Sequence, residues 1–375
     1  MSLHDKLDAP GPKKLLALDG GGIRGIIAIE VLARIEALLR ERFSAPDLVL
    51  AEYFDYIGGT STGAIIATCL ALGFSVERIR TFYLESGAAM FAPARMRERF
   101  RNRFTADNLR AILQNVIGEQ TTLESGDLRT LLLLVMRNAT TNSPWPISNN
   151  PRAMFNDATL RDCNLRLPLW QLVRASTAAP TYFPPEVITV GDRSFIFVDG
   201  AITVYNNPAF QLFLMATLEP YRVAWPVGED RMLLVSVGTG VGPKSIAELR
   251  PEQMTLLYNA SAIPSALIHA ASVEQDVLCR AFGRVEAGEA LDLELGDLAG
   301  VPSPGGAKLF TYARYDVELS RAGLDALGLE HIDPATVQPL DNIDHLEELK
   351  LVGAALAQRR VSMRPFERFL THSNV

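Results

Sequence analysis

Apolar residues form two short runs near the start of the chain, and each run leads through glycines into a helical pattern. Residues 13–19 are mostly apolar and end in a glycine cluster, which predicts a buried strand. From 26 to 42 apolar residues recur at helical spacing. A second strand is expected at about 53–57, then a glycine turn at 58–63 and a helix at 64–72 that is apolar nearly all round. This repeated order predicts an α/β layered domain with glycine loops at the carboxyl ends of its strands.

Later segments continue the mixture of strands and helices. Strands are expected at 128–137, 194–198 and 232–237, and helices at 75–115 and 169–177. Beyond about Tyr312 the pattern is mostly that of amphipathic helices. We expect an N-terminal tail at 1–12, a catalytic domain at 13–240, and a C-terminal part at 241–375 that partly completes the fold and partly forms a helical extension.

Composition narrows the class of protein only slightly. The chain of 375 residues is 48% hydrophobic and 21% charged, as in ordinary globular proteins. A net charge of -7 argues against binding to a nucleic-acid polymer. The charged N-terminus lacks a signal-peptide core, and no apolar run approaches the roughly 20 residues of a membrane span. We therefore expect a cytoplasmic protein, and five arginines at 95–103 allow either a solvated surface or peripheral contact with an anionic membrane.

Three cysteines, Cys69, Cys163 and Cys279, are widely spaced and form no C-x-x-C pair. This arrangement predicts reduced thiols rather than a disulfide framework or a metal site. Cys69 falls inside the apolar helix expected at 64–72, where it is expected to be buried.

A serine stands at the second glycine turn, in the pattern G-x-S-x-G from Gly59 to Gly63. On a sharp turn from strand to helix, such a serine is exposed above the sheet, and the flanking glycines allow close backbone approach. Its position near a helix N-terminus also favours developing negative charge. Ser61 is therefore the candidate nucleophile.

The first glycine turn, Asp19-Gly20-Gly21-Gly22-Ile23-Arg24-Gly25, allows two interpretations. Its glycines satisfy G-x-G-x-x-G, but a dinucleotide site needs an acidic residue at the end of the next strand, and here that strand ends in the serine turn. Consecutive glycine N–H groups instead suit an oxyanion hole. Its candidate residues are Gly20, Gly21, Gly22, Ile23, Arg24 and Gly25. Arg24 is expected either to brace the loop or to help hold an anionic headgroup.

A base is required for the serine, and Asp199 is the candidate. It follows an apolar strand and precedes Gly200 and Ala201, in a position that also suits a turn cap. The histidines are poorer candidates, because two lie in the tails and His269, His331 and His345 do not stand at strand ends beside glycines. A carboxylate can act as the base when it lies within hydrogen-bond reach of the hydroxyl.

Together these segments resemble the patatin-like phospholipase family. The run at 19–25, Gly-Thr-Ser-Thr-Gly at 59–63 and Asp-Gly-Ala at 199–201 are similar to its three signatures in order, and residues 175–185 are similar to its stretch before the aspartate. The resemblance, over about 13–240, implies a three-layer α/β fold with a mostly parallel central sheet. It also implies a Ser61–Asp199 dyad, with oxyanion N–H groups around Gly21, Gly22 and Ile23. The implied substrate is a phospholipid or lysophospholipid at a membrane surface, and neither a metal nor another cofactor is implied.

Three alternatives remain open. One is an α/β-hydrolase in which Ser61 and an aspartate work with a late histidine such as His269 or His331. Another is a catalytically silent lipid-binding protein of the same fold. The third keeps the enzyme but resembles bacterial patatin-like antiphage effectors that cyclic nucleotides activate to degrade membranes. Residues after about 240 would then hold the activator.

Overall fold

The computed structural model describes residues 3–90, 106–242, 252 and 254–370, so the arginine-rich stretch 95–103 lies outside the described residues. The described strands form one nine-stranded sheet in the order β5-β6-β3-β2-β1-β7-β9-β8, with β4 also paired to β3. The strands are β1 (Lys13–Leu18), β2 (Tyr56–Thr60), β3 (Leu131–Asn138), β4 (Ser143–Ser148), β5 (Glu186–Val190), β6 (Arg193–Asp199), β7 (Met232–Val237), β8 (Gly283–Ala287) and β9 (Phe310–Tyr315).

The sheet is mostly parallel. Strands β3, β2, β1, β7, β9 and β8 pair in parallel, whereas β4 and β6 each pair antiparallel with β3, and β5 pairs antiparallel with β6. Both strands beyond residue 240, β8 and β9, continue the sheet past β7. The carboxyl ends of β1, β2 and β7 lie side by side, which brings the two glycine turns and residues 238–240 to one edge of the sheet.

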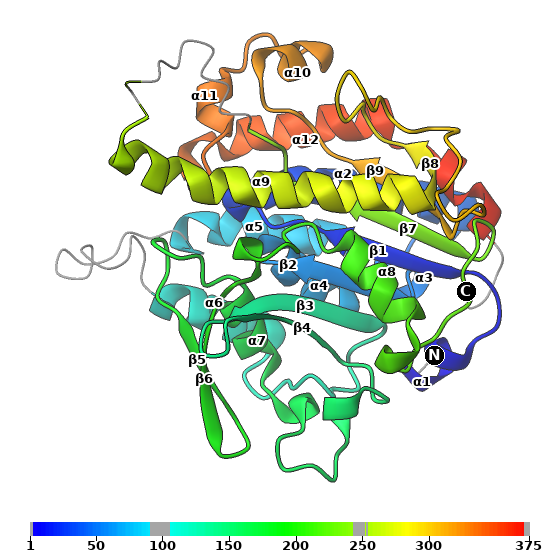
Figure 1. The fold of residues 1–375 in the computed structure, drawn as a ribbon, viewed down its shortest axis with the longest axis vertical. Helices are drawn as coiled ribbons and strands as arrows, with labels where there is room; N and C mark the ends of the chain where they lie inside the picture. The colour runs from blue at the N-terminus through cyan, green and yellow to red at the C-terminus, as the bar shows by residue number, and fades with distance from the viewer. Residues whose placement is uncertain (1–2, 91–105, 243–251, 253, 371–375) are drawn as a thin grey trace.

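Helices cover both faces of this sheet and give the three expected layers (Figure 1). One face packs against α2 (Gly25–Phe43), α4 (Thr62–Ala71), α5 (Val76–Met90), α6 (Ala106–Ile117), α7 (Leu169–Ser176) and α12 (Leu346–Arg360). The other packs against α1 (Leu3–Asp8), α8 (Ala209–Thr217) and α9 (Leu256–Phe282). Neighbouring residues alternate between the two cores: Leu16 and Leu18 enter the first, Leu15 and Ala17 the second. Both faces are buried, so the parallel strands read as continuous apolar runs.

Several sequence predictions are confirmed and others are corrected. The α/β fold with a mostly parallel sheet is confirmed, and so are free, buried cysteines, with Cys69 inside α4. The second strand is β2 at 56–60, because residues 50–53 form the short helix α3 (Leu50–Tyr53). The helical region expected after about Tyr312 begins a few residues later, because Tyr312 lies within strand β9. Short helices α10 (Arg321–Ala326) and α11 (Pro334–Val337) precede α12. No helix in the described part of the chain is long and apolar enough to cross a bilayer.

Candidate active site

Ser61 occupies a sharp turn between β2 and α4. Its backbone has φ 55 and ψ -123, a conformation that non-glycine residues rarely adopt and that marks strain at functional sites. The neighbouring glycines permit this turn: a Cβ on Gly63 would lie 2.3 Å from the carbonyl oxygen of Leu18. Gly59 lies within β2, opposite Leu18 of β1. Ser61 therefore lies in the turn just after β2, at the edge of the sheet where the carboxyl ends of the parallel strands meet.

The side chain of Ser61 points to Asp199. Its Oγ donates a hydrogen bond of 2.6 Å to Asp199 Oδ2, although 138 residues separate the two. Asp199 ends β6, and the antiparallel register of β6 with β3 pairs it with Met136 near the carboxyl end of β3. Its second oxygen accepts a 2.7 Å hydrogen bond from the Ala201 N–H, and Gly200 separates the two residues. Both side chains are buried, Asp199 more completely than Ser61.

The environment makes Asp199 a better base than an ordinary aspartate. Burial raises its pKa to about 6, while the hydrogen bonds from Ser61 and Ala201 and the positive charge of Arg174 oppose the rise. At neutral pH the group is therefore mostly a carboxylate, yet one with increased affinity for a proton. This combination suits a group that takes a proton from a serine hydroxyl near pH 7.

Two residues of α7 act on this pair: Ser176 through a hydrogen bond to Ser61, and Arg174 through its charge on Asp199. Sequence reasoning gave neither of them a role. Ser176 Oγ accepts a 3.0 Å hydrogen bond from the Ser61 backbone N–H and donates one of 2.6 Å to the Val135 carbonyl. Arg174 is fully buried, and its Nη2 donates to the Pro184 carbonyl at 2.8 Å. Both lie in or beside the stretch 175–185 that the family resemblance singled out, which is the signal that could have found them.

The glycine loop lies next to the serine, and most of its N–H groups are already bonded. A Cβ on Gly20 would lie 3.2 Å from the Ser61 Cβ. Gly20 N–H donates to the Asn206 carbonyl at 3.0 Å, Ile23 N–H to the Leu340 carbonyl at 2.9 Å, and Arg24 N–H to the Gly21 carbonyl at 3.3 Å. Gly25 N–H bonds carbonyls within the same turn. Gly21 and Gly22 keep N–H groups without a partner among the described residues, as an anion site requires.

Arg24 points away from Gly21 and Gly22 toward the C-terminal third. Its Nη1 donates to the Gln338 carbonyl at 3.2 Å, and burial lowers its pKa to about 10. Together with the bond from Ile23 to Leu340, this contact ties the loop to the segment after α11. The bracing role expected for Arg24 therefore has a physical basis.

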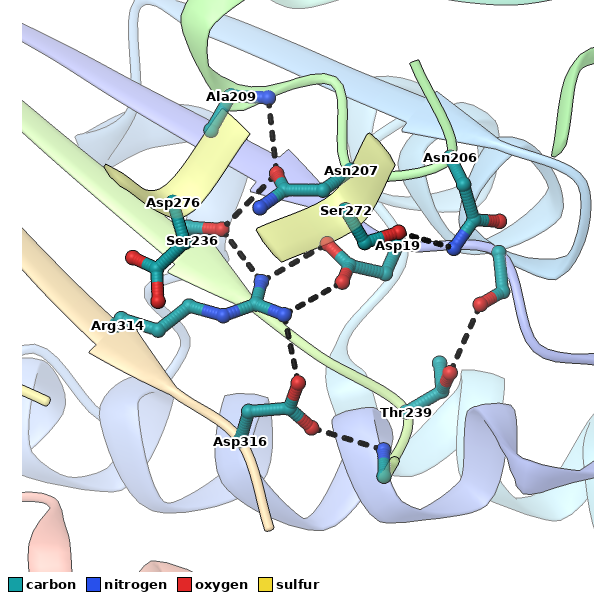
Figure 2. Close-up of polar contacts among 12 residues, drawn as sticks. Asp19, Asn206, Asn207, Ala209, Ser236, Thr239, Ser272, Asp276, Arg314 and Asp316 are labelled. Atoms are coloured by element: carbon teal, nitrogen blue, oxygen red, sulfur yellow. Dashed lines mark hydrogen bonds and ion pairs between the residues drawn. The ribbon is translucent and has the colours of Figure 1, made fainter. Parts of the chain in front are cut away.

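A buried ionic cluster fixes the start of the same loop (Figure 2). Arg314 of β9 makes a two-point ion pair with Asp19, at 2.9 and 2.6 Å, and also bonds Asp316 Oδ2 at 2.6 Å. Asp316 Oδ1 accepts the Gly240 N–H at 2.9 Å, and Thr239 Oγ1 donates to the Gly20 carbonyl at 2.8 Å. Burial raises the pKa of Asp19 although Arg314 opposes the rise. The loop is thus held by residues from the far end of the sequence.

The histidines whose side chains the structure describes form no hydrogen bond with Ser61 or Asp199. His269 and His331 are exposed, and His345 Nδ1 bonds Glu348 Oε1 at 2.9 Å. No hydrogen bond in the described part of the chain joins a histidine to Ser61 or Asp199. Among the same residues, no group of three histidine, cysteine, aspartate or glutamate side chains is arranged to hold a metal ion.

Comparisons with known proteins identify the family of this chain. Residues 16–213 match the patatin-like phospholipase family, a span that includes Ser61, Asp199 and the glycine loop. The chain is 30% identical over 244 residues to Patatin-17 of Solanum cardiophyllum, covering 60% of each protein. It is also 30% identical over 234 residues to the cGAMP-activated phospholipase of Escherichia coli (strain TW11681), covering 60% of this chain and 62% of that one. This chain belongs to the patatin-like phospholipase family.

The sequence similarity covers only part of each relative, and the similarity to solved structures is weak. The alignments span about three fifths of the length of these two relatives. Among solved structures, VipD from Legionella pneumophila matches with a TM-score of 0.35 and 14% sequence identity, over 91% of this chain and 67% of that one. A similarity of that size carries no argument about function.

Proposed function

We propose that this chain is a lipid acyl hydrolase that cleaves carboxylic esters of phospholipids or lysophospholipids with a Ser61–Asp199 dyad. The observation that carries the proposal is the 2.6 Å hydrogen bond from Ser61 Oγ to Asp199 Oδ2 at a strained strand-to-helix turn. Membership of the patatin-like phospholipase family supports the same chemistry.

The proposed reaction has two stages. As Ser61 Oγ attacks the ester carbonyl carbon, its proton passes to Asp199, and the N–H groups of Gly21 and Gly22 stabilise the oxyanion. The leaving alcohol takes the proton from Asp199, and the acyl group stays on Ser61. Water then attacks this acyl-enzyme and gives a proton to Asp199, and collapse of the second oxyanion returns the proton to Ser61 and releases the fatty acid.

Release of fatty acid from mixed phospholipid vesicles tests this proposal. Wild type is compared with Ser61→Ala, Asp199→Ala and His269→Ala, with EDTA present. The proposal predicts that the first two substitutions abolish release and that His269→Ala retains it. Loss of release in His269→Ala with retention in Asp199→Ala would replace the dyad with a histidine triad. A folded wild type that releases nothing from any ester tested would favour a silent lipid-binding protein.

A second proposal concerns activation, and it rests on the name of one relative, the cGAMP-activated phospholipase. We propose that a cyclic nucleotide increases the lipase activity of this chain. Adding cyclic di- and trinucleotides should then raise fatty-acid release and the melting temperature. If both quantities stay unchanged across the set of nucleotides, this proposal fails while the hydrolase proposal stands.

A further inference from the structure

The helix α9 contains a long stretch without charge. From Thr255 to Val273 the sequence has no aspartate, glutamate, lysine or arginine. Helices on the surface of globular proteins normally carry charged or polar residues on the face turned to water. In this half of α9 the polar side, with Ser265, His269 and Ser272, carries no Asp, Glu, Lys or Arg, and the opposite side is apolar.

The same half of the helix is uncovered. Residues 263–267 are five consecutive exposed residues, with Ile263 51% and Leu267 64% exposed. Because a helix turns once in about 3.6 residues, five in a row face every direction around its axis. Figure 1 shows the amino-terminal end of α9 reaching past the edge of the strands. The segment is therefore an exposed, uncharged rod and not a stripe against the sheet.

The carboxyl-terminal half of α9 is anchored by buried polar groups. Asp276 forms an ion pair of 2.9 Å with Arg280 and accepts a 2.9 Å hydrogen bond from the Tyr312 hydroxyl of β9. Cys279 belongs to the core on that face of the sheet. The exposed half is thus an extension of a fixed helix.

The exposed half starts beside the candidate active site. Ser272 Oγ accepts a 3.1 Å hydrogen bond from Asn206 Nδ2 (Figure 2). The backbone carbonyl of Asn206 accepts the Gly20 N–H of the glycine loop. At about 1.5 Å per residue, Leu267 lies roughly 8 Å along the helix from Ser272. Two exposed apolar side chains follow Asp199: Ile202, in the short 3-10 helix 200–202 that contacts α9, and Val204.

We propose that residues 263–270 of α9, with Ile202 and Val204, dock on a lipid bilayer and bring ester groups to Ser61. This inference rests on the proposed lipid hydrolase function. Ile263, Ala266, Leu267 and Ala270 are all exposed and recur at three- and four-residue spacing, so they share one apolar face. A helix that lies in a bilayer interface buries such a face in lipid. The surface is also continuous with the site where a lipid ester has to arrive. The bilayer is therefore the occupant that the observations favour.

Vesicle binding tests the proposal with the double variant Ile263→Glu/Leu267→Glu. Glutamate is a good helix former, so the changes add charge without disrupting α9. The matched control is Leu293→Glu, which adds charge at a fully exposed leucine beyond the anchored end of the helix. All proteins carry Ser61→Ala, to prevent hydrolysis, and are floated with phosphatidylethanolamine–phosphatidylglycerol vesicles. The bound fraction should fall at least about tenfold for the double variant and stay at the wild-type level for Leu293→Glu.

Activity measurements with Ser61 intact separate this proposal from the hydrolase proposal. Relative to hydrolysis of soluble p-nitrophenyl butyrate, release from vesicles should fall at least about tenfold in the double variant. If the double variant binds and hydrolyses vesicles like wild type, the docking proposal is overturned and the hydrolase stands. If no ester is hydrolysed but vesicle binding still depends on Ile263 and Leu267, the docking stands and the hydrolase fails. If the double variant changes only the oligomeric state, the surface joins copies of the chain, which overturns the proposal.

Discussion

Asp19 and Arg314 form a two-point ion pair with bonds of 2.6 and 2.9 Å, although 295 residues separate them. Asp19 stands at the first residue of the glycine loop, and Arg314 lies on β9, near the other end of the chain. Since both side chains are buried, neither can exchange its partner for water. The position of the loop beside Ser61 therefore depends on the C-terminal third of the protein.

Arg314→Met should destabilise the protein by about 3–5 kcal/mol, because it leaves Asp19 and Asp316 buried without their cation. Urea unfolding measures the loss. The double variant Asp19→Asn/Arg314→Met should recover part of it, since it removes one of the two stranded charges. If the loss of stability in the double variant equals the sum of the losses in Asp19→Asn and Arg314→Met alone, the two residues are not energetically coupled.

The raised pKa of Asp199 predicts an acid limb in the activity. The dyad needs an ionised carboxylate, so kcat/KM for a soluble ester should decline as the pH falls below about 6. A matched profile of His269→Ala should keep the same limb. If His269→Ala removed or moved the limb, the titrating group would be a histidine instead of Asp199.

The same pKa predicts that Asp199→Asn stabilises the fold at high pH. A folded pKa of about 6, against an ordinary value of 3.8, means that ionising Asp199 costs roughly 3 kcal/mol of stability. Asparagine avoids this cost, which is present above pH 6 and vanishes below pH 3.8. The free energy of unfolding of the inactive variant should therefore exceed that of wild type at pH 8 and converge with it near pH 4. A constant difference at all pH values would show that Asp199 does not carry the shift.

Ser176→Ala should slow catalysis through the position of Ser61. The substitution leaves the buried Ser61 N–H without its acceptor, so the strained turn loses one of its fixed contacts. We expect kcat to fall about tenfold, which corresponds to about 1.4 kcal/mol, with little change in KM. Thr177→Ala is the matched control, because Thr177 Oγ1 bonds the Arg174 carbonyl within α7 and does not touch Ser61. Equal losses of kcat in both variants would indicate a general effect of disturbing α7.

Gly22→Ala should disrupt the proposed oxyanion site. Gly22 has φ +60, and a Cβ there would lie 2.3 Å from the Leu340 carbonyl oxygen, so the loop has to move. Loss of one donor predicts a fall in kcat of about 10²–10³. Gly126→Ala is the control, since its Cβ would meet nothing within 4 Å. A Gly22→Ala variant with wild-type kcat would remove this loop from the oxyanion site.

The elements that position Ser61 could be predicted from the sequence because local patterns determine them. The apolar run before Gly20 and the buried helix after Ser61 each carry their own signal, and the structure has β1 and α4 there. Asp199 could be proposed from chemistry, because a nucleophilic serine needs a base. Its place between an apolar strand and Gly200 made it the best candidate for that base.

The supports of the site could not be predicted in the same way. Arg314 lies on a strand whose six residues are all buried, so the strand shows no alternation, and its partner is 295 residues away. Ser176 acts on Ser61 through a backbone contact that leaves no spacing pattern. The uncharged half of α9 contains Pro264, which argues against a helix in the sequence, and only the structure shows that Ile263 and Leu267 are exposed. In each case the feature depends on how distant segments of the chain pack, which a local sequence pattern does not show.

Covalent labelling tests the central claim, that Asp199 activates Ser61 without a histidine. The protein is treated with a long-chain fluorophosphonate, and the modified peptide is identified by mass. We predict one adduct, on Ser61, formed at equal rates in wild type and His269→Ala, absent in Ser61→Ala and slowed at least about 100-fold in Asp199→Asn. An adduct on another residue, or labelling of Asp199→Asn at the wild-type rate, would contradict the dyad.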